Sequence, residues 1–77
     1  MRVQILGTGC PKCEQLLAHA QQAVAELGLA AEVEKVEDIA EIARSRVLAI
    51  PALVVDGVVK AAGRVLSPED IKKLLQG

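Results

Sequence analysis

The spacing of hydrophobic and polar residues changes along the first half of the chain, and each change marks a secondary-structure element. Short β-prone runs at residues 2–6 and 31–36 predict strands. Pro11 suits the first turn of a helix between them, and Gly28 stands where a helix-ending glycine is favoured. Within that helix, apolar residues follow the i, i+3, i+4, i+7 spacing of one helical face, namely Cys13, Leu16, Leu17, Ala20, Val24 and Leu27.

The second half of the chain adds a short helix and a β-hairpin. Apolar spacing predicts the helix over about residues 38–46, and β-prone runs predict strands at 52–56 and 58–62. Asp56 and Gly57 join these two runs, and Asp-Gly favours a tight hairpin turn because both turn positions take a positive φ. The two runs are therefore predicted to pair as antiparallel strands.

A last helix begins at Ser67 and Pro68. Ser67 can cap it, Pro68 fits its first position, and its apolar face consists of Ile71, Leu74 and Leu75. The predicted order of elements is β-α-β-α-β-β-α. A strand–helix–strand unit followed by a hairpin and a helix gives an α/β fold, with a four-stranded mixed sheet covered by helices.

Length and composition limit the size and kind of the core. The chain has 77 residues, which is near the lower limit for a self-sufficient core, so we treat residues 1–77 as a single domain. It contains no Phe, Tyr or Trp, so Leu, Ile, Val and Ala must fill the interior. We expect Val47, Leu48 and Val65 to be among these core residues.

Charge and hydropathy argue against several kinds of partner. The formal net charge is −1 with the two signs interspersed, and no aromatic residue is present to stack on bases, so we expect no nucleic-acid partner. No run approaches the ~20 apolar residues of a membrane span, so we expect no membrane partner. The N-terminus lacks the apolar run of a secretory signal, which favours a cytoplasmic protein.

The two cysteines of the chain stand three positions apart, in Cys10-Pro11-Lys12-Cys13, where the first predicted strand gives way to a helix. Cys10 falls at the helix N-terminus, where unpaired N–H groups and the positive end of the dipole stabilise an anion. We therefore expect the pKa of the Cys10 thiol to lie below the ~8.5 of a free thiol, with Lys12 adding positive charge. Cys13 lies one turn further on, on the apolar face. This pattern predicts Cys10 as a nucleophile and Cys13 as the thiol that resolves a mixed disulfide.

Two alternatives to disulfide exchange remain open for this motif. A CxxC pair at a strand–helix turn also serves as a copper or zinc carrier in small heavy-metal-binding domains. Those domains usually have a Met two residues before the first cysteine, where this chain has Thr8, and they end on a strand. A closed zinc site needs further ligands, and His19 lies on the polar helix face. The other alternative is a redox-sensing interaction module, in which the disulfide changes the affinity for a partner.

Ile50-Pro51 follows the second predicted helix and immediately precedes a strand. The succession of strand, CxxC, helix, strand, helix, Ile-Pro, hairpin and helix resembles the thioredoxin/glutaredoxin superfamily over essentially the whole chain. It is most similar to the small redox-active disulfide proteins of bacteria and archaea. The resemblance implies a thioredoxin-like fold and a thiol–disulfide oxidoreductase with Cys10 and Cys13 as catalytic residues, and with no metal or organic cofactor. It also implies a cis bond before Pro51, facing the disulfide.

The resemblance further implies how substrate and reductant meet the cysteines. An extended substrate segment would bind to an apolar collar around Gly9, Ile50 and Pro51. Pro11 and Lys12, between the cysteines, are also expected to bind substrate. The implied substrate is a protein disulfide, and the reductant is a thioredoxin-reductase-like flavoprotein or a low-molecular-weight thiol. Gly9 replaces the usual Trp of thioredoxins, Lys12 replaces the aromatic residue of glutaredoxins, and only Gly63 remains of their Gly-Gly pair. We expect a monomer, since such a fold can stand alone.

Overall fold

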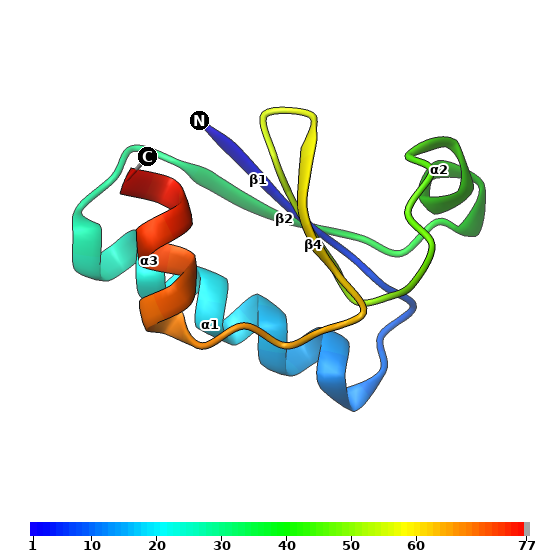
Figure 1. The fold of residues 1–77 in the computed structure, drawn as a ribbon, viewed down its shortest axis with the longest axis horizontal. Coiled ribbons are helices and arrows are strands. Elements are labelled where there is room, and N and C mark those ends of the chain that lie inside the picture. Colours follow the sequence, from blue (N-terminus) through cyan, green and yellow to red (C-terminus); the bar gives the residue numbers. More distant parts are fainter. Residues whose placement is uncertain (77) are drawn as a thin grey trace.

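The computed structural model describes residues 1–76 and contains the elements in the expected order (Figure 1). Its strands are β1 (Arg2–Leu6), β2 (Glu32–Val36), β3 (Ala52–Val55) and β4 (Val58–Ala62). Its helices are α1 (Pro11–Leu27), α2 (Ile39–Arg44) and α3 (Pro68–Gln76). The predicted α/β fold is confirmed; Gly77, the last residue of the predicted domain, lies outside the described residues. Within residues 1–76, no helix combines the length and the apolar character that a membrane crossing requires.

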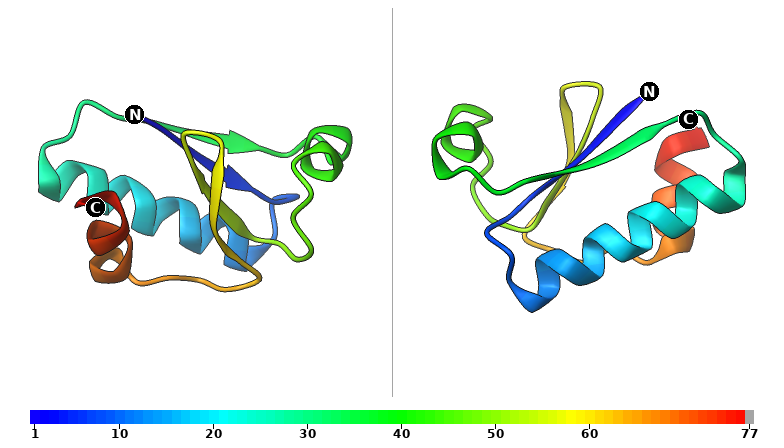
Figure 2. Two further views of the ribbon diagram at one scale, coloured as in Figure 1. Left: turned by 45° about the horizontal axis from the view of Figure 1, so that its top comes forward. Right: turned by 180° about the vertical axis from the view of Figure 1, so that it is seen from behind.

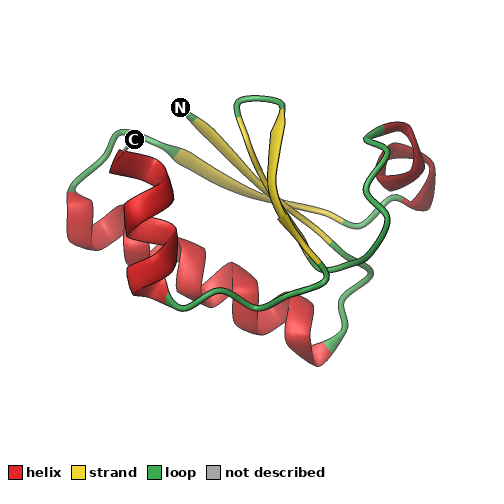
Figure 3. Cartoon of the chain, viewed as in Figure 1, coloured by secondary structure: helices red, strands yellow, loops and turns green. Residues whose placement is uncertain are grey.

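The four strands form one mixed sheet in the order β2-β1-β3-β4. β1 pairs in parallel with β2, while β3 pairs antiparallel with both β1 and β4. Leu6, at the end of β1, stands opposite Val36 of β2 and Ala52 of β3. The loops that follow β1 and β2 therefore meet the loop that precedes β3 at one end of the sheet (Figure 3).

Side chains alternate between the two faces of the sheet, so the strands contribute to two cores. Val3 and Ile5 of β1 belong to the larger core, together with Leu16 of α1 and Ile71 of α3. Figure 2 shows α1 and α3 on the same side of the sheet, with α2 apart from them. The smaller core lies on the opposite face and consists of Leu6, Val36, Ala52 and Val54, packed against Ile42 and Val47.

Three local signals in the sequence are confirmed by the backbone. Gly28 ends α1 in the left-handed conformation, with φ of 63°. Asp56 and Gly57 both take a positive φ, 49° and 81°, as the predicted hairpin turn requires. The Oγ of Ser67 accepts the N–H of Asp70 at 3.1 Å and so caps α3. Each signal acts within a few residues, so the sequence alone is enough to predict it.

The segment between α2 and β3 differs in part from the expectation. Leu48 is fully exposed (100%), so its prediction as a core residue is wrong. Val47 packs against the smaller core and Val65 against the larger one, as expected. α2 ends at Arg44, and Arg46 takes a positive φ of 62°, which turns the chain that follows. After this turn Val47 packs on the sheet and Leu48 is left in solvent.

Candidate active site

Cys10 is the N-cap of α1 and forms a disulfide with Cys13, one turn into the helix. The Cα atoms of the pair are 5.0 Å apart. Cys10 has an extended backbone (φ −68°, ψ 161°), and its Sγ accepts the N–H of Cys13 at 3.1 Å. Pro11 occupies the start of the helix, where its missing N–H leaves no hydrogen bond unmade. The pair therefore sits where free N–H groups favour negative charge.

The two cysteines differ in their access to solvent. Cys10 is half-buried, whereas Cys13 is only 3% exposed. Gly7 covers Cys13 so closely that an added Cβ at Gly7 would lie 2.9 Å from Cys13 Cβ and would overlap its Sγ. The same Cβ would stand 3.9 Å from the Cα of Pro51. The chain after β1 therefore has no room for a side chain here. Gly7 lies between Cys13 and Pro51.

Pro51 belongs to a loop that is hydrogen-bonded to the residue following β4. The Ile50–Pro51 peptide is cis. The side chain of Pro51 is buried, and its carbonyl accepts the N–H of Gly63 at 2.9 Å. Ile50, immediately before it, is 39% exposed. The loop thus holds a buried proline next to the cysteine pair and leaves an apolar side chain accessible.

The other predicted substrate-binding residues lie around the start of α1. Gly9, Pro11 and Lys12 are all exposed. Pro51 therefore lies near the cysteine pair, with Gly7 between them. The remaining predicted substrate-binding residues, Ile50 included, are accessible to solvent.

Comparison with known proteins agrees with this geometry. Residues 1–76 match the thioredoxin domain family. The chain belongs to that family. A thioredoxin of Methanothermobacter thermautotrophicus is 48% identical over 75 residues, which cover 97% of each chain. A thioredoxin of Methanocaldococcus jannaschii is 43% identical over 74 residues, which cover 96% of this chain and 85% of that protein.

Family membership and the Cys10–Cys13 disulfide together make this protein a thiol–disulfide oxidoreductase. Thiol–disulfide exchange is therefore its function. This finding favours disulfide exchange over the two alternatives, a metal carrier and a redox-sensing module. Membership of the thioredoxin domain family also implies protein disulfides as substrates and a reductase as a partner.

Near this thioredoxin-type disulfide lies a group of charges that the sequence pattern did not reveal. Oε2 of Glu37 would be 3.1 Å from a Cβ placed on Gly9. Nζ of Lys35 lies 3.3 Å from Oε1 of Glu14 and 3.9 Å from Oε1 of Glu37. The missed signal is topological: β1 and β2 run parallel, so the residue after β2 emerges beside the loop that leads to Cys10.

Among residues 1–76, no group of three or more His, Cys, Asp or Glu side chains is arranged to hold a metal ion. Nδ1 of His19, considered above as a ligand, lies 2.8 Å from the carbonyl oxygen of Leu66. His19 thus ties α1 to the segment that leads into α3.

Proposed function

We propose that Cys10 is the attacking thiolate of this oxidoreductase and that Cys13 is the resolving thiol. The difference in access between the two sulfurs carries the proposal: Cys10 caps α1 and is the more accessible, whereas Cys13 is 3% exposed. In the reduced protein, the N–H of Cys13, now 3.1 Å from Cys10 Sγ, would stabilise a thiolate on Cys10. Cys10 is therefore the cysteine that a substrate can approach from solvent.

The proposed cycle transfers two electrons from the protein dithiol to the substrate. The Cys10 thiolate attacks one sulfur of a substrate disulfide, and the other substrate sulfur leaves as a thiolate that takes up a proton. Cys13 then loses its proton and attacks Cys10 Sγ in the mixed disulfide. The second substrate thiol is released, and the Cys10–Cys13 disulfide remains until a reductant restores the dithiol.

The substrate backbone is proposed to lie along Ile50 and Pro51, with Gly9, Pro11 and Lys12 lining the approach to Cys10. Two observations support this placement. Pro51 is linked to the cysteine pair through Gly7, and Ile50 presents an accessible apolar side chain next to it. At the start of α1, the exposed Gly9 and Pro11 add small residues, and Lys12 adds a cation.

We further propose that the protein acts as a single-domain monomer over residues 1–77, in the cytoplasm. Its two cysteines form a redox pair rather than a disulfide scaffold, which suits a reducing compartment. The reductant is a thioredoxin-reductase-like flavoprotein or a low-molecular-weight thiol. Turnover with each class of reductant in separate assays distinguishes the two.

The redox couple is the first property to test. The protein is equilibrated in dithiothreitol buffers of graded potential, and free thiols are counted by alkylation and mass spectrometry. We expect a reversible two-electron couple between about −180 and −280 mV, the range of thioredoxin-type and related oxidoreductases. A pair that does not form the disulfide reversibly would refute the proposed cycle.

The assignment of the two roles needs a matched pair of variants. Cys13→Ser should still attack a disulfide substrate and should accumulate a stable mixed disulfide through Cys10. Cys10→Ser keeps a thiol of the same kind in a 3% exposed position and should form no such adduct at a comparable rate. Trapping by Cys10→Ser instead of Cys13→Ser would reverse the two roles.

A further inference from the structure

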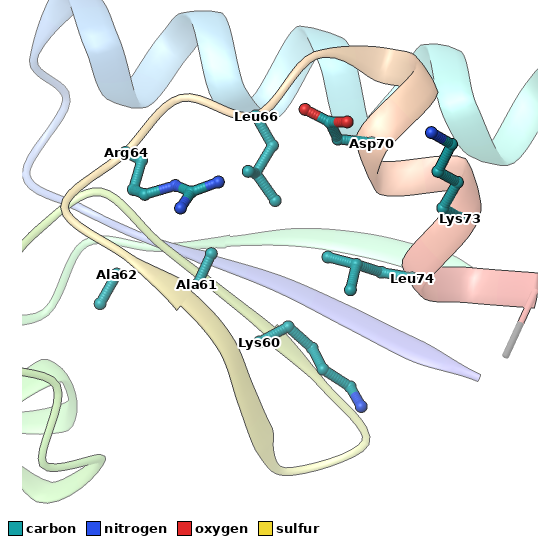
Figure 4. Close-up of a pocket in the computed structure, with 8 residues that line it drawn as sticks. All are labelled: Lys60, Ala61, Ala62, Arg64, Leu66, Asp70, Lys73 and Leu74. Carbon is teal, nitrogen blue, oxygen red and sulfur yellow. The ribbon is translucent and has the colours of Figure 1, made fainter.

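A recess between β4 and α3, separate from the cysteine pair, has a volume of about 510 Å³. Figure 4 shows the side chains of Leu66 and Leu74 directed into the space between the two elements. The apolar lining consists of Ala61, Ala62, Leu66 and Leu74. Its charged lining comes from β4, the loop after it and α3, and consists of Lys60, Arg64, Asp70 and Lys73. We refer to this recess as the β4–α3 groove.

The groove is locally positive in a chain whose formal net charge is −1. It is lined by three cations and one carboxylate, and within residues 1–76 none of these cations takes part in an ion pair. Figure 4 shows the charged groups of Lys60, Arg64 and Lys73 apart from one another around the groove, and they do not converge on one point. Several carboxylates spaced along an extended segment fit this arrangement better than one compact anion.

A β-bulge turns Lys60 toward the groove. Leu53 of β3 pairs with Ala61, and the next residue, Val54, pairs with Val59, so Lys60 is the extra residue on β4. Such an extra residue breaks the alternation of side chains between the two faces of a sheet. Lys60 and Ala61 consequently both line the groove, although they are neighbours in one strand.

One end of the groove adjoins the loop that holds the cis proline. The N–H of Gly63 donates to the carbonyl of Pro51 at 2.9 Å, and Arg64 is the next residue. From Gly63 to Lys60 is a further ~10 Å along the strand, at about 3.3 Å per residue. The cis-proline loop and the Arg64 end of the groove are therefore adjacent, and Lys60 lines the groove further along β4.

We propose that the β4–α3 groove docks an acidic segment of the redox partner while the partner's disulfide reacts at Cys10. The matching segment is a stretch of polypeptide with an apolar side chain flanked by carboxylates. Its apolar side chain contacts the half-buried Leu74, next to the buried Leu66, and its carboxylates pair with the three cations. This inference rests on the proposed attack by Cys10.

The test uses peptides of defined sequence in place of the partner. The first acidic peptide has a cysteine, a Gly-Ser-Gly-Ser spacer and then Asp-Leu-Asp-Asp. Its amide match has Asn in place of every Asp. A second acidic peptide and its amide match have the same parts in the reverse order, with the cysteine last. The spacer spans up to ~13 Å when extended. Each cysteine carries thionitrobenzoate as a mixed disulfide, so attack by Cys10 on the peptide sulfur releases the coloured thiolate. The second-order rate constant is measured with the reduced protein at low and high salt.

For at least one order, the acidic peptide should react about tenfold faster than its amide match at low salt, as three exposed ion pairs allow. This ratio should fall toward one in Lys60→Gln/Lys73→Gln. The control Arg2→Gln/Arg44→Gln removes the same charge from elsewhere on the surface and should keep the ratio. A wild-type ratio of one in both orders, or equal losses in both double variants, would overturn the proposal.

Two further outcomes distinguish docking in the groove from binding of a small anion and from a failure at Cys10. If millimolar inorganic phosphate at constant ionic strength abolishes the preference, the groove is a site for a small anion, and the proposal is wrong. If Cys10→Ser reacts with the amide peptide as fast as the wild type, the proposed attack by Cys10 is refuted, whatever the groove does. If the amide peptide reacts at a normal rate but the acidic peptide reacts no faster, only the proposed docking in the groove is refuted.

Discussion

Substituting alanine for Gly7 tests how closely the chain after β1 passes the cysteine pair. The new Cβ would lie 2.9 Å from Cys13 Cβ, against the ~3.5–4.0 Å of a normal carbon–carbon contact. Cys13 Cβ is fixed to the first turn of α1, so relief requires movement of the helix start. Overpacking of this kind costs about 1–3 kcal/mol. A chain of 77 residues has a total stability of about 4–12 kcal/mol, so the loss is a large fraction of it.

The same substitution should affect the oxidised protein more than the reduced one. The added methyl also overlaps Cys13 Sγ, which the disulfide holds in place but which a free thiol can rotate away. Gly7→Ala should therefore favour the dithiol and move the potential to a less negative value. Each 1 kcal/mol of difference between the two forms corresponds to about 20 mV for a two-electron couple.

Urea unfolding followed by far-UV circular dichroism measures both effects, because the chain has no aromatic residue for fluorescence. The unfolding free energy is compared with and without dithiothreitol, and the potential is read by thiol alkylation. Gly28→Ala is the matched control: its added Cβ meets nothing within 4 Å, and its positive φ of 63° should cost ~1–2 kcal/mol in both forms alike. Equal stability of Gly7→Ala and the wild type, or an equal loss in both redox forms, would refute the reasoning.

Three further substitutions test the core, the hairpin and a surface carboxylate. Leu16→Ala, at a fully buried position, should lower the unfolding free energy in urea by about 2–5 kcal/mol, and a loss below ~1 kcal/mol would contradict its place in the core. Asp56 accepts the N–H of Arg2 at 2.8 Å and has φ of 49°, so Asp56→Ala should cost ~1–2 kcal/mol and Asp56→Asn clearly less; equal costs would count against this account. Hydrogen bonds from Gln4 and Arg2 lower the pKa of Glu34, so its stabilisation is present above the unfolded pKa and is lost as the pH falls through the folded one. Glu34→Gln should therefore be less stable than the wild type near neutral pH and match it in acid, and denaturation curves with a constant gap would show otherwise.

The order and type of all the elements could be predicted from the sequence because their signals are local. The apolar period of α1, the Asp56-Gly57 turn and the Ser67 cap each act within a few residues. The same holds for Cys10 at a helix N-terminus, since Pro11 and the apolar period after it mark where the helix begins. The cis form of the bond before Pro51 came from the family resemblance instead, because the residues alone favour trans.

What only the tertiary structure decided depends on contacts between segments far apart in the chain. Glu37 lies beside Gly9 because β1 and β2 are parallel and end together. Lys60 lines the β4–α3 groove because a bulge against β3 breaks the alternation along β4. Leu48 was expected in the core from its apolar character alone, but a left-handed turn at Arg46 leaves it in solvent. Hydrophobic pattern specifies which elements form, whereas pairing register and loop direction decide which side chains meet.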